Sequence, residues 1–301
     1  MSAHATEAPR PRDATGAVAA SAIAAPVLAN RPTVRTVYAW ELRKLLAQKR
    51  TYIGFGCAVL VPLIFIASLL ADSGGPEGIP FGDYVRESGL AIPLVGLFFG
   101  AFWFFPLVTA LVAGDIVATE DGNGTLKTIL TRSVDRWQIF VAKVLAAFTY
   151  AFAALVLFVG VGLIIGGIIW GFDPLVSLSG NKISVERSLL LLGATTLAYF
   201  LPTMAVASLA ILLSTVTRNS AAAVVATLML SLIMQLLAIV SALDFLRPYL
   251  LPEQFNAWQG LLRDPIDWAP VVRAAWVSAL FGSPCLAWAF TYFIRRDVTG
   301  G

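Results

Sequence analysis

Six long hydrophobic runs separated by short polar stretches constrain the fold of this 301-residue chain more than any other feature. A helix needs roughly 20 residues to cross about 30 Å of hydrocarbon, and every run reaches that length. Backbone groups in hydrocarbon must be satisfied within their own segment, and the runs lack the alternation that is typical of a membrane β-barrel. We therefore predict an all-α polytopic membrane protein with six transmembrane spans, at residues 51–71, 89–113, 140–170, 188–214, 220–243 and 271–293.

The composition agrees with this fold class, because 58% of the residues are hydrophobic and only 13% are charged. A water-soluble domain carries about 25% charged residues.

Gly162 and Gly166 are four residues apart in the third predicted span, a spacing that lets two helices approach closely. Prolines inside the spans are expected to kink the helices without breaking them, at Pro62, Pro93, Pro106, Pro202 and Pro284.

The distribution of Lys and Arg predicts the orientation, because positive charges favour the cytoplasmic side of a membrane. With the N-terminus inside, the external loops hold six of the 21 Lys and Arg and leave fifteen for the cytoplasm. The sequence thus predicts a multi-pass protein of the bacterial plasma (inner) membrane with both termini cytoplasmic. The net charge of +3 then reflects membrane topology, and no nucleic-acid partner is expected.

The chain divides into four predicted regions. Residues 1–33 read as a disordered cytoplasmic tail, and residues 297–301 as a cytoplasmic end. Residues 34–50 are expected to form an amphipathic helix at the membrane surface, anchored by Arg43 and Lys44. The six-helix transmembrane domain occupies residues 51–296. The expected apolar stripe of the amphipathic helix consists of Val34, Tyr38, Leu42, Leu45 and Leu46.

Several classes of chemistry lack their residues in this sequence. The single histidine, His4, lies in the tail, and no Cys, Met or His cluster exists that could bind zinc or copper. Neither a GxSxG elbow nor a GxxxxGK[ST] phosphate loop occurs, so we expect no hydrolase site and no ATPase site of this chain's own. Ionisable residues are nearly absent from the centres of the spans, which argues against a transporter driven by protons or sodium.

Polar and aromatic residues inside the spans suggest a substrate path, but other interpretations remain open. Gln235 is the one strongly polar side chain near mid-bilayer, and it forms either a hydrogen bond across a helix interface or a contact with a substrate. Phe98 and Trp103 belong to the aromatic run "FFGAFWFF", which either lines a route for a hydrophobic substrate or faces lipid.

The longest polar stretch between two spans is "GDIVATEDGNGTLKTILTRSVDRWQIFVAK", from Gly114 to Lys143. Glu120 precedes a "GNG" turn, after which Thr125 can cap a short helix. Lys143, at the head of the third span, is expected to extend back to the lipid headgroups. The stretch therefore predicts a short amphipathic coupling helix tied to two spans. Its apolar face would consist of Leu126, Ile129 and Leu130, with Lys127 exposed.

The pairing of "ELRKLLAQKR" with "ATEDGNGTLKTILTRSVDRWQIFVAK" resembles the permease subunits of type 2 ATP-binding-cassette (ABC-2) transporters. It is most similar to the branch labelled multi-copper enzyme maturation permease. That family shows a Glu, then Gly-Thr-Leu, a basic residue, a Pro with an Arg three positions on, and a Lys at the head of the third span. Ser133 stands where the family has Pro. The matching positions are Glu120, Gly124, Thr125, Leu126, Lys127, Ser133, Arg136 and Lys143.

The resemblance implies a permease subunit that pairs with a second permease, identical or related, and with two cytoplasmic ATPase subunits that bind ATP with magnesium. The segment from Thr125 to Thr131 would dock on an ATPase, with Glu120, Lys127 and Arg136 as polar contacts. The expected activity is export of a hydrophobic or amphipathic substrate, with no cofactor bound by this chain itself. A membrane-embedded enzyme and a non-transport scaffold protein remain alternatives.

Overall fold

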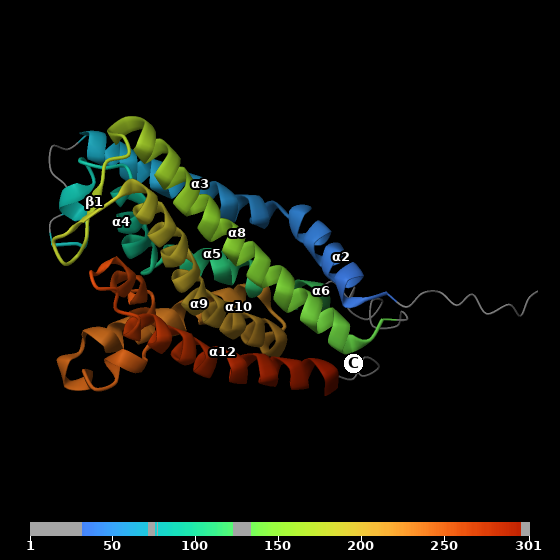
Figure 1. Cartoon of the computed structure of the whole chain (residues 1–301). Coiled ribbons are helices and arrows are strands. Elements are labelled where there is room, and N and C mark those ends of the chain that lie inside the picture. The colour runs from blue at the N-terminus through green and yellow to red at the C-terminus, as the bar shows by residue number, and fades with distance from the viewer. Residues whose placement is uncertain (1–31, 72–75, 77, 123–133, 296–301) are drawn as a thin grey trace, which may run out of the picture.

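A computed structural model describes residues 32–71, 76, 78–122 and 134–295, and it is a bundle of long helices (Figure 1). Five of these helices are long and apolar enough to cross a membrane, and a bent pair of shorter helices would make a sixth span. The five helices are α3 (Lys49–Ala71), α8 (Arg136–Trp170), α9 (Val185–Thr217), α10 (Ser220–Ile239) and α12 (Ala269–Arg295).

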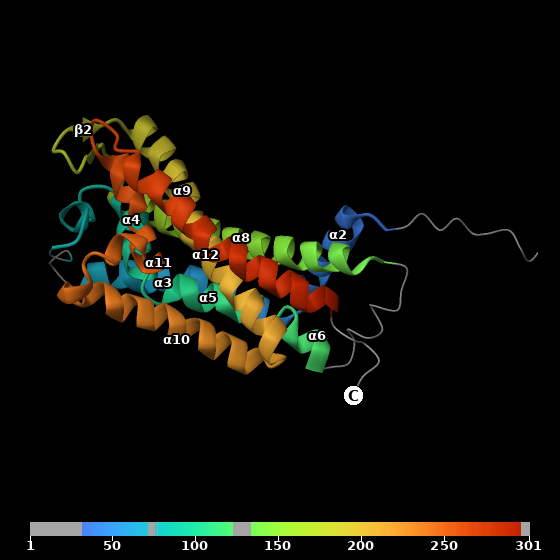
Figure 2. The same ribbon diagram turned by 90° about the horizontal axis from the view of Figure 1, so that it is seen from below.

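Helix α9 is the centre of the bundle, because 61% of its most apolar window is buried inside the protein, against 17% for α10. Figure 2 shows α9 beneath α12, with α10 along the outer edge of the molecule.

A short turn joins α9 to α10. Arg218 adopts a left-handed backbone conformation there, and the side chain of Asn219 accepts a hydrogen bond of 3.1 Å from the Ala222 amide, which caps α10.

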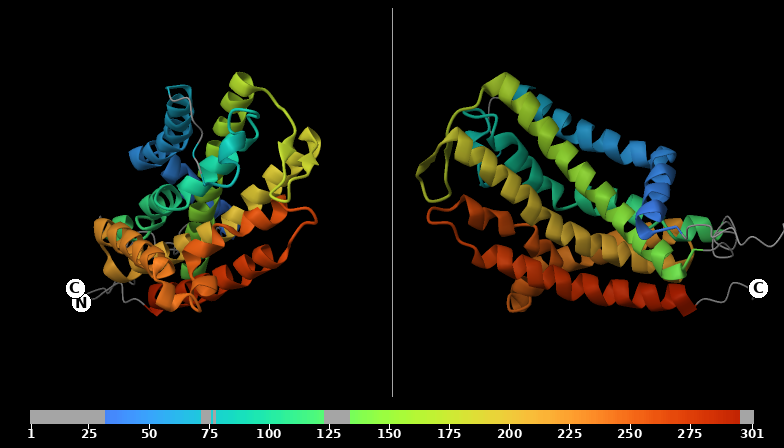
Figure 3. Two further views of the ribbon diagram at one scale, coloured as in Figure 1. Left: turned by 90° about the vertical axis from the view of Figure 1, so that its left-hand side faces the viewer. Right: turned by 45° about the vertical axis from the view of Figure 1, so that its right-hand side comes forward.

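The predicted amphipathic helix at 34–50 is divided in the structure. Helix α2 spans Val34–Leu46, and after Gln48 the chain turns into α3, so that α2 lies at an angle to α3 across one end of the bundle (Figure 3). Helix α2 packs on α8, where the Tyr38 and Thr149 hydroxyls are 2.7 Å apart. Its buried stripe is Val37, Glu41 and Leu45, so the expected apolar stripe was only partly right.

The second predicted span is not one helix. Helix α4 (Ala91–Gly100) is bent by 65° from the helical segment Phe104–Gly122, which contains α5 (Phe104–Ala113) and α6 (Ala118–Gly122). The expectation that Pro106 only kinks its helix was therefore wrong. Pro106 has no amide hydrogen to donate to the carbonyl of Phe102, four residues earlier, and the chain breaks there. By contrast, Pro62, Pro202 and Pro284 lie within continuous helices.

Glycines allow two close approaches within this part of the bundle. At Gly100, an added Cβ would lie 2.6 Å from the ring of Phe105, so only a glycine lets this ring pack across the bend. On α8, an added Cβ at Gly162 would contact Pro93, and one at Gly166 would meet Gly89 and Ile92. The predicted close helix approach at Gly162 and Gly166 is thus confirmed, as a contact of α8 with α4 and the residues before it.

Short elements cover the opposite end of the bundle from α2 (Figure 1). Two residues in each of β1 (Leu175–Val176) and β2 (Lys182–Ile183) pair antiparallel, a small departure from the expected all-α fold. Helix α10 ends at Ile239, four residues before the predicted end of the fifth span. The remaining short helices at this end are η1 (Gly82–Tyr84), η2 (Ser241–Leu243), η3 (Arg247–Tyr249), α11 (Leu251–Gln254) and η4 (Ala257–Leu262).

Candidate functional site

The predicted coupling helix lies outside the residues that the structure describes, which stop at Gly122 and resume at Val134. This applies to Gly124, Thr125, Leu126, Lys127, Ile129 and Leu130. Glu120 in α6 and Arg136 at the start of α8 flank this segment on its two sides. The candidate site is therefore the set of described residues from which the segment departs and to which it returns.

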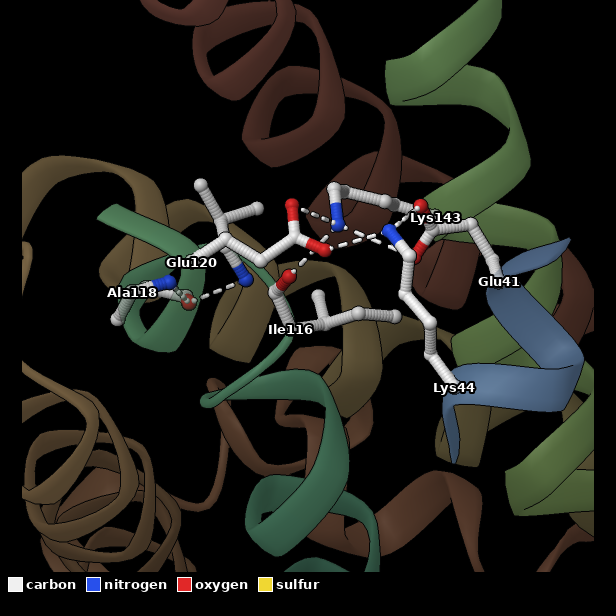
Figure 4. Close-up of polar contacts among 8 residues, drawn as sticks. Glu41, Lys44, Ile116, Ala118, Glu120 and Lys143 are labelled. Atoms are coloured by element: carbon white, nitrogen blue, oxygen red, sulfur yellow. Dashed lines mark hydrogen bonds and ion pairs between the residues drawn. The ribbon is translucent and has the colours of Figure 1, made fainter. Parts of the chain in front are cut away.

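Four charged side chains from three helices form an ionic cluster at this place, shown in Figure 4. The cluster consists of Glu41 and Lys44 on α2, Glu120 on α6 and Lys143 on α8. Lys143 Nζ lies 2.7 Å from Glu120 Oε2 and 3.1 Å from Glu41 Oε2. Lys44 Nζ lies 2.8 Å from Glu120 Oε1 and 2.7 Å from Glu41 Oε1. Each lysine therefore bridges both carboxylates, and the four formal charges cancel.

Lys143 does not extend to the protein surface, contrary to the expectation that it anchors at the headgroups. Its side chain is 1% exposed, and its ammonium also donates a hydrogen bond of 3.1 Å to the carbonyl of Ile116. The reason is tertiary, because α2 and the turn before α6 both cover the face of α8 that carries Lys143. Removing one partner of such a buried ion pair typically costs 3–5 kcal/mol, so the cluster holds three helices in one arrangement.

Lys44 forms the outer edge of the cluster, with a side chain that is 40% exposed. Partial burial lowers the pKa of Lys44, but the carboxylates of Glu120 and Glu41 outweigh that effect and raise the pKa above its usual value. Lys44 therefore stays charged near neutral pH. Arg43, its neighbour on α2, is exposed. Of the three predicted anchors, only Arg43 is exposed as an anchor would be, whereas Lys44 and Lys143 are engaged by the cluster.

A second group of polar contacts holds the turn between α5 and α6. Asp115 in this turn forms an ion pair with Arg50 of α3 and accepts a hydrogen bond from Thr119. Ser214 of α9 accepts hydrogen bonds from the amides of Val117 and Ala118, at 3.3 and 3.0 Å. These amides start α6 and have no partner within their own helix, so Ser214 satisfies them in the interior.

Arg136, at the start of α8, contacts α12. Its guanidinium donates a hydrogen bond of 2.9 Å to the carbonyl of Ile294, in the last turn of α12. A cation at this place satisfies a free carbonyl and is favoured by the helix dipole. Arg136 thus joins the start of α8 to the end of α12, and Arg136 and Glu120 contact different helices.

Of the three residues predicted to line a substrate path, Gln235 lines a small cavity that Phe98 and Trp103 do not line. Gln235 of α10 donates a hydrogen bond of 2.7 Å to the carbonyl of Phe102, which Pro106 leaves without its helical donor. Phe98 packs against Phe99 and Phe102, and Trp103 is 56% exposed. The cavity beside Gln235 measures only about 10 Å³, which suffices for at most about one water molecule. This hydrogen bond is the kind of contact that one of the two interpretations of Gln235 predicted, an amide bonded across a helix interface.

Sequence reasoning missed Glu41 as a member of the site and did not assign a partner to Asp115. A signal for Glu41 exists, because it is a lone acidic residue at the spacing that places Val37 and Leu45 on the same face of α2. A carboxylate on a buried stripe needs a cation from another element. The identity of that cation, Lys143, is 102 positions away in the sequence and could not be read from spacing.

Comparison with known proteins adds a family but no activity. Residues 55–299 match the family described as "Protein of unknown function (DUF2705)". A protein of Bacillus subtilis (strain 168) named "Uncharacterized protein YhcI" is 27% identical over 235 residues, which cover 73% of this chain and 70% of that protein.

Proposed function

The chain belongs to the family described as "Protein of unknown function (DUF2705)", and we propose that it is the membrane-spanning permease subunit of an ABC-2 transporter. In this proposal a separate ATPase supplies the energy, and the substrate is hydrophobic or amphipathic. The chain lies in the bacterial plasma (inner) membrane with both termini in the cytoplasm. A second permease, identical or related, completes the transmembrane part.

The observation that carries the proposal is the ionic cluster of Glu41, Lys44, Glu120 and Lys143. It joins α2, α6 and α8, and in the sequence α6 and α8 flank the segment that is predicted to contact an ATPase. A force applied to that segment reaches α6 on one side and α8 on the other. Both are held by buried ion pairs, so a displacement is passed to the spans instead of being absorbed by loose side chains.

The contacts around the cluster extend this frame to the other spans. Arg50 of α3, Ser214 of α9 and Ile294 of α12 each contact the turn before α6 or the start of α8. A movement of the segment between Gly122 and Val134 would therefore act on most of the bundle at once. This is the structural requirement for coupling between an ATP site on one protein and a transport path in another.

The test is purification of the full-length chain from its own membranes in a mild detergent, followed by mass spectrometry of the bound proteins. We expect an ATPase with a GxxxxGK[ST] phosphate loop. In the double variant Leu126→Asp/Ile129→Asp, an aspartate pair replaces two apolar side chains of the predicted contact. Recovery of the ATPase should then fall at least tenfold, which corresponds to a loss of about 1.4 kcal/mol of binding free energy.

Leu178→Asp is the matched control, because Leu178 is exposed near the β1–β2 turn, at the opposite end of the bundle. This variant should retain the ATPase. Recovery of the same amount of ATPase with the double variant as with the wild type would contradict the proposed docking site. Recovery of no such ATPase with the wild-type chain would contradict the transporter itself and favour a membrane enzyme or a scaffold protein.

A further inference from the structure

A cavity of about 220 Å³ lies between α8, α9 and α12, and the ionic cluster contributes none of its lining. It is open on one side. Phe148 of α8 and Met204 of α9 form part of its wall, and α12 contributes mostly small residues. All the side chains that line it are uncharged. The small α12 residues are Ala275, Ser278, Ala279, Gly282 and Ser283.

The space exists because small residues of α9 and α12 face one another. A Cβ added at Gly282 would lie 3.4 Å from Ser208 Oγ and 3.6 Å from the Cα of Ala205. These are ordinary contact distances, so the methyl group of an alanine at position 282 would fit without a clash. Gly282, Ala205 and Ser208 are buried and form the floor, whereas Ala279 is exposed and lies at the rim.

One buried hydroxyl at this cavity lacks a partner. Ser278 is 7% exposed, and its Oγ forms no hydrogen bond with the residues that the structure describes. Two hydroxyls of the facing helix α9 are satisfied by the carbonyl four residues earlier. Ser208 donates to Met204 at 2.7 Å, and Thr203 donates to Tyr199 at 2.9 Å. Buried polar groups normally have a partner, so an unsatisfied Ser278 beside an open space indicates that a ligand supplies it.

We propose that this cavity binds a small neutral ring compound that carries one hydroxyl or carbonyl group. An engineered apolar cavity of about 150 Å³ binds benzene, so about 220 Å³ accommodates a ring of one or two fused cycles. A charged compound is excluded, since no lining side chain could neutralise it and a buried charge without a partner is costly. A hydrocarbon chain of a lipid would fill the space but leave Ser278 unsatisfied.

The hydroxyl of Ser278 can both donate and accept, so it suits a ligand hydroxyl or a ligand carbonyl. Phe148 is the aromatic residue in the lining and can pack against the ring. This inference does not depend on the proposed transport function, because it rests on α8, α9 and α12 alone.

The experiment measures the binding of 2-naphthol and of naphthalene by the full-length chain in phosphatidylcholine nanodiscs. Empty nanodiscs give the partition of each probe into lipid, which is subtracted. The two probes share a ring system and differ in one hydroxyl group. We expect saturable binding of one 2-naphthol per chain, with an affinity roughly fivefold above that of naphthalene, the ratio that one net hydrogen bond supplies.

Two variants locate the site and its hydrogen bond. Ala279→Leu fills the cavity from the rim and should abolish saturable binding of both probes. Ala287→Leu makes the same change at an exposed position of α12 outside the cavity and should leave binding unaltered. Ser278→Ala should weaken 2-naphthol roughly fivefold and leave naphthalene unchanged.

Each alternative result overturns part or all of the inference. Saturable binding that survives Ala279→Leu overturns the assignment of this cavity. Two results overturn the role of the hydroxyl group and leave a hydrocarbon site. In the first, the wild type binds both probes equally well. In the second, the wild type and Ser278→Ala bind 2-naphthol equally well. Gly282→Ala fills the floor with an ordinary contact and repeats the test should Ala279→Leu fail to yield a monodisperse protein.

Discussion

The replacement Lys143→Met tests whether the ionic cluster holds the helices around the predicted coupling segment. Methionine keeps most of the length of the lysine side chain but removes its charge. Within the ionic cluster, Glu41 and Glu120 then keep Lys44 as their shared cation, whose side chain is 40% exposed. The carbonyl of Ile116 also loses its donor.

The size of the effect follows from the burial of the three groups. The side chains of Lys143, Glu41 and Glu120 are 1%, 4% and 14% exposed, so solvent screens their interaction little. Breaking a buried ion pair costs about 3–5 kcal/mol. Because Lys44 still contacts both carboxylates, we expect the lower end, a loss of about 3 kcal/mol in the free energy of unfolding.

The double variant Glu41→Gln/Lys143→Met separates charge from packing. It removes one cation and one anion, so that Glu120 and Lys44 remain as a neutral pair at 2.8 Å. The unsatisfied carbonyl of Ile116 persists, and its cost is about 1–2 kcal/mol. The double variant should therefore be more stable than Lys143→Met alone, with a coupling between the two sites of at least about 1 kcal/mol.

The assay is reversible unfolding by sodium dodecyl sulfate in mixed micelles, followed by circular dichroism, for the wild type, both single variants and the double variant. Arg43→Met is the matched control, because Arg43 is a cation on the exposed side of α2 and its loss should change the free energy by less than about 0.5 kcal/mol. A Lys143→Met variant as stable as Arg43→Met would refute the reasoning. A double variant less stable than Lys143→Met would also refute it.

Three further perturbations use the same unfolding assay. The pKa of Lys44 is raised, so the stabilisation from its charge is fully present below the ordinary pKa of 10.5 and is lost as the pH rises through the raised pKa. The free energy of unfolding above pH 10.5 should therefore fall more in the wild type than in Lys44→Met. A parallel fall in both proteins would contradict this assignment. Gln235→Leu removes the donor to the Phe102 carbonyl and should cost about 1 kcal/mol, whereas Met229→Leu, an exposed change on the same helix, should cost almost nothing. Gly89→Ala places a Cβ 2.3 Å from the backbone of α8 and should lower the free energy of unfolding by about 1–3 kcal/mol. Gly160→Ala, whose Cβ faces open space, should cause no loss. Equal stabilities of the two variants would argue against this close packing.

The lengths and positions of the spans were readable from the sequence because they depend on a local property. A run of about 20 apolar residues can only be a helix in hydrocarbon, so five predicted spans recur as continuous helices within a few residues of their expected ends. The second span was mispredicted at residues 101–103. Pro106 predicts that the carbonyl of Phe102 loses its helical hydrogen bond. The sequence does not show that Gln235 of a distant helix satisfies this carbonyl and so permits a full break.

Some residues of the candidate site could be predicted from the sequence, and others could not. Glu120, Arg136 and Lys143 were identified because they match the family pattern that the polar stretch resembles, which is local information. Their partners were not predictable, because Glu41 lies 102 positions from Lys143 and Ile294 lies 158 positions from Arg136.

The sequence alone determined that this chain forms apolar helices long enough to span a bilayer, and where its polar segment interrupts them. Only the tertiary structure decided that Lys143 is buried among carboxylates instead of lying at the surface, and that small residues of α9 and α12 leave a cavity. The physical reason is that chain length and hydrophobicity act within one segment, whereas burial and charge compensation depend on which segments pack together.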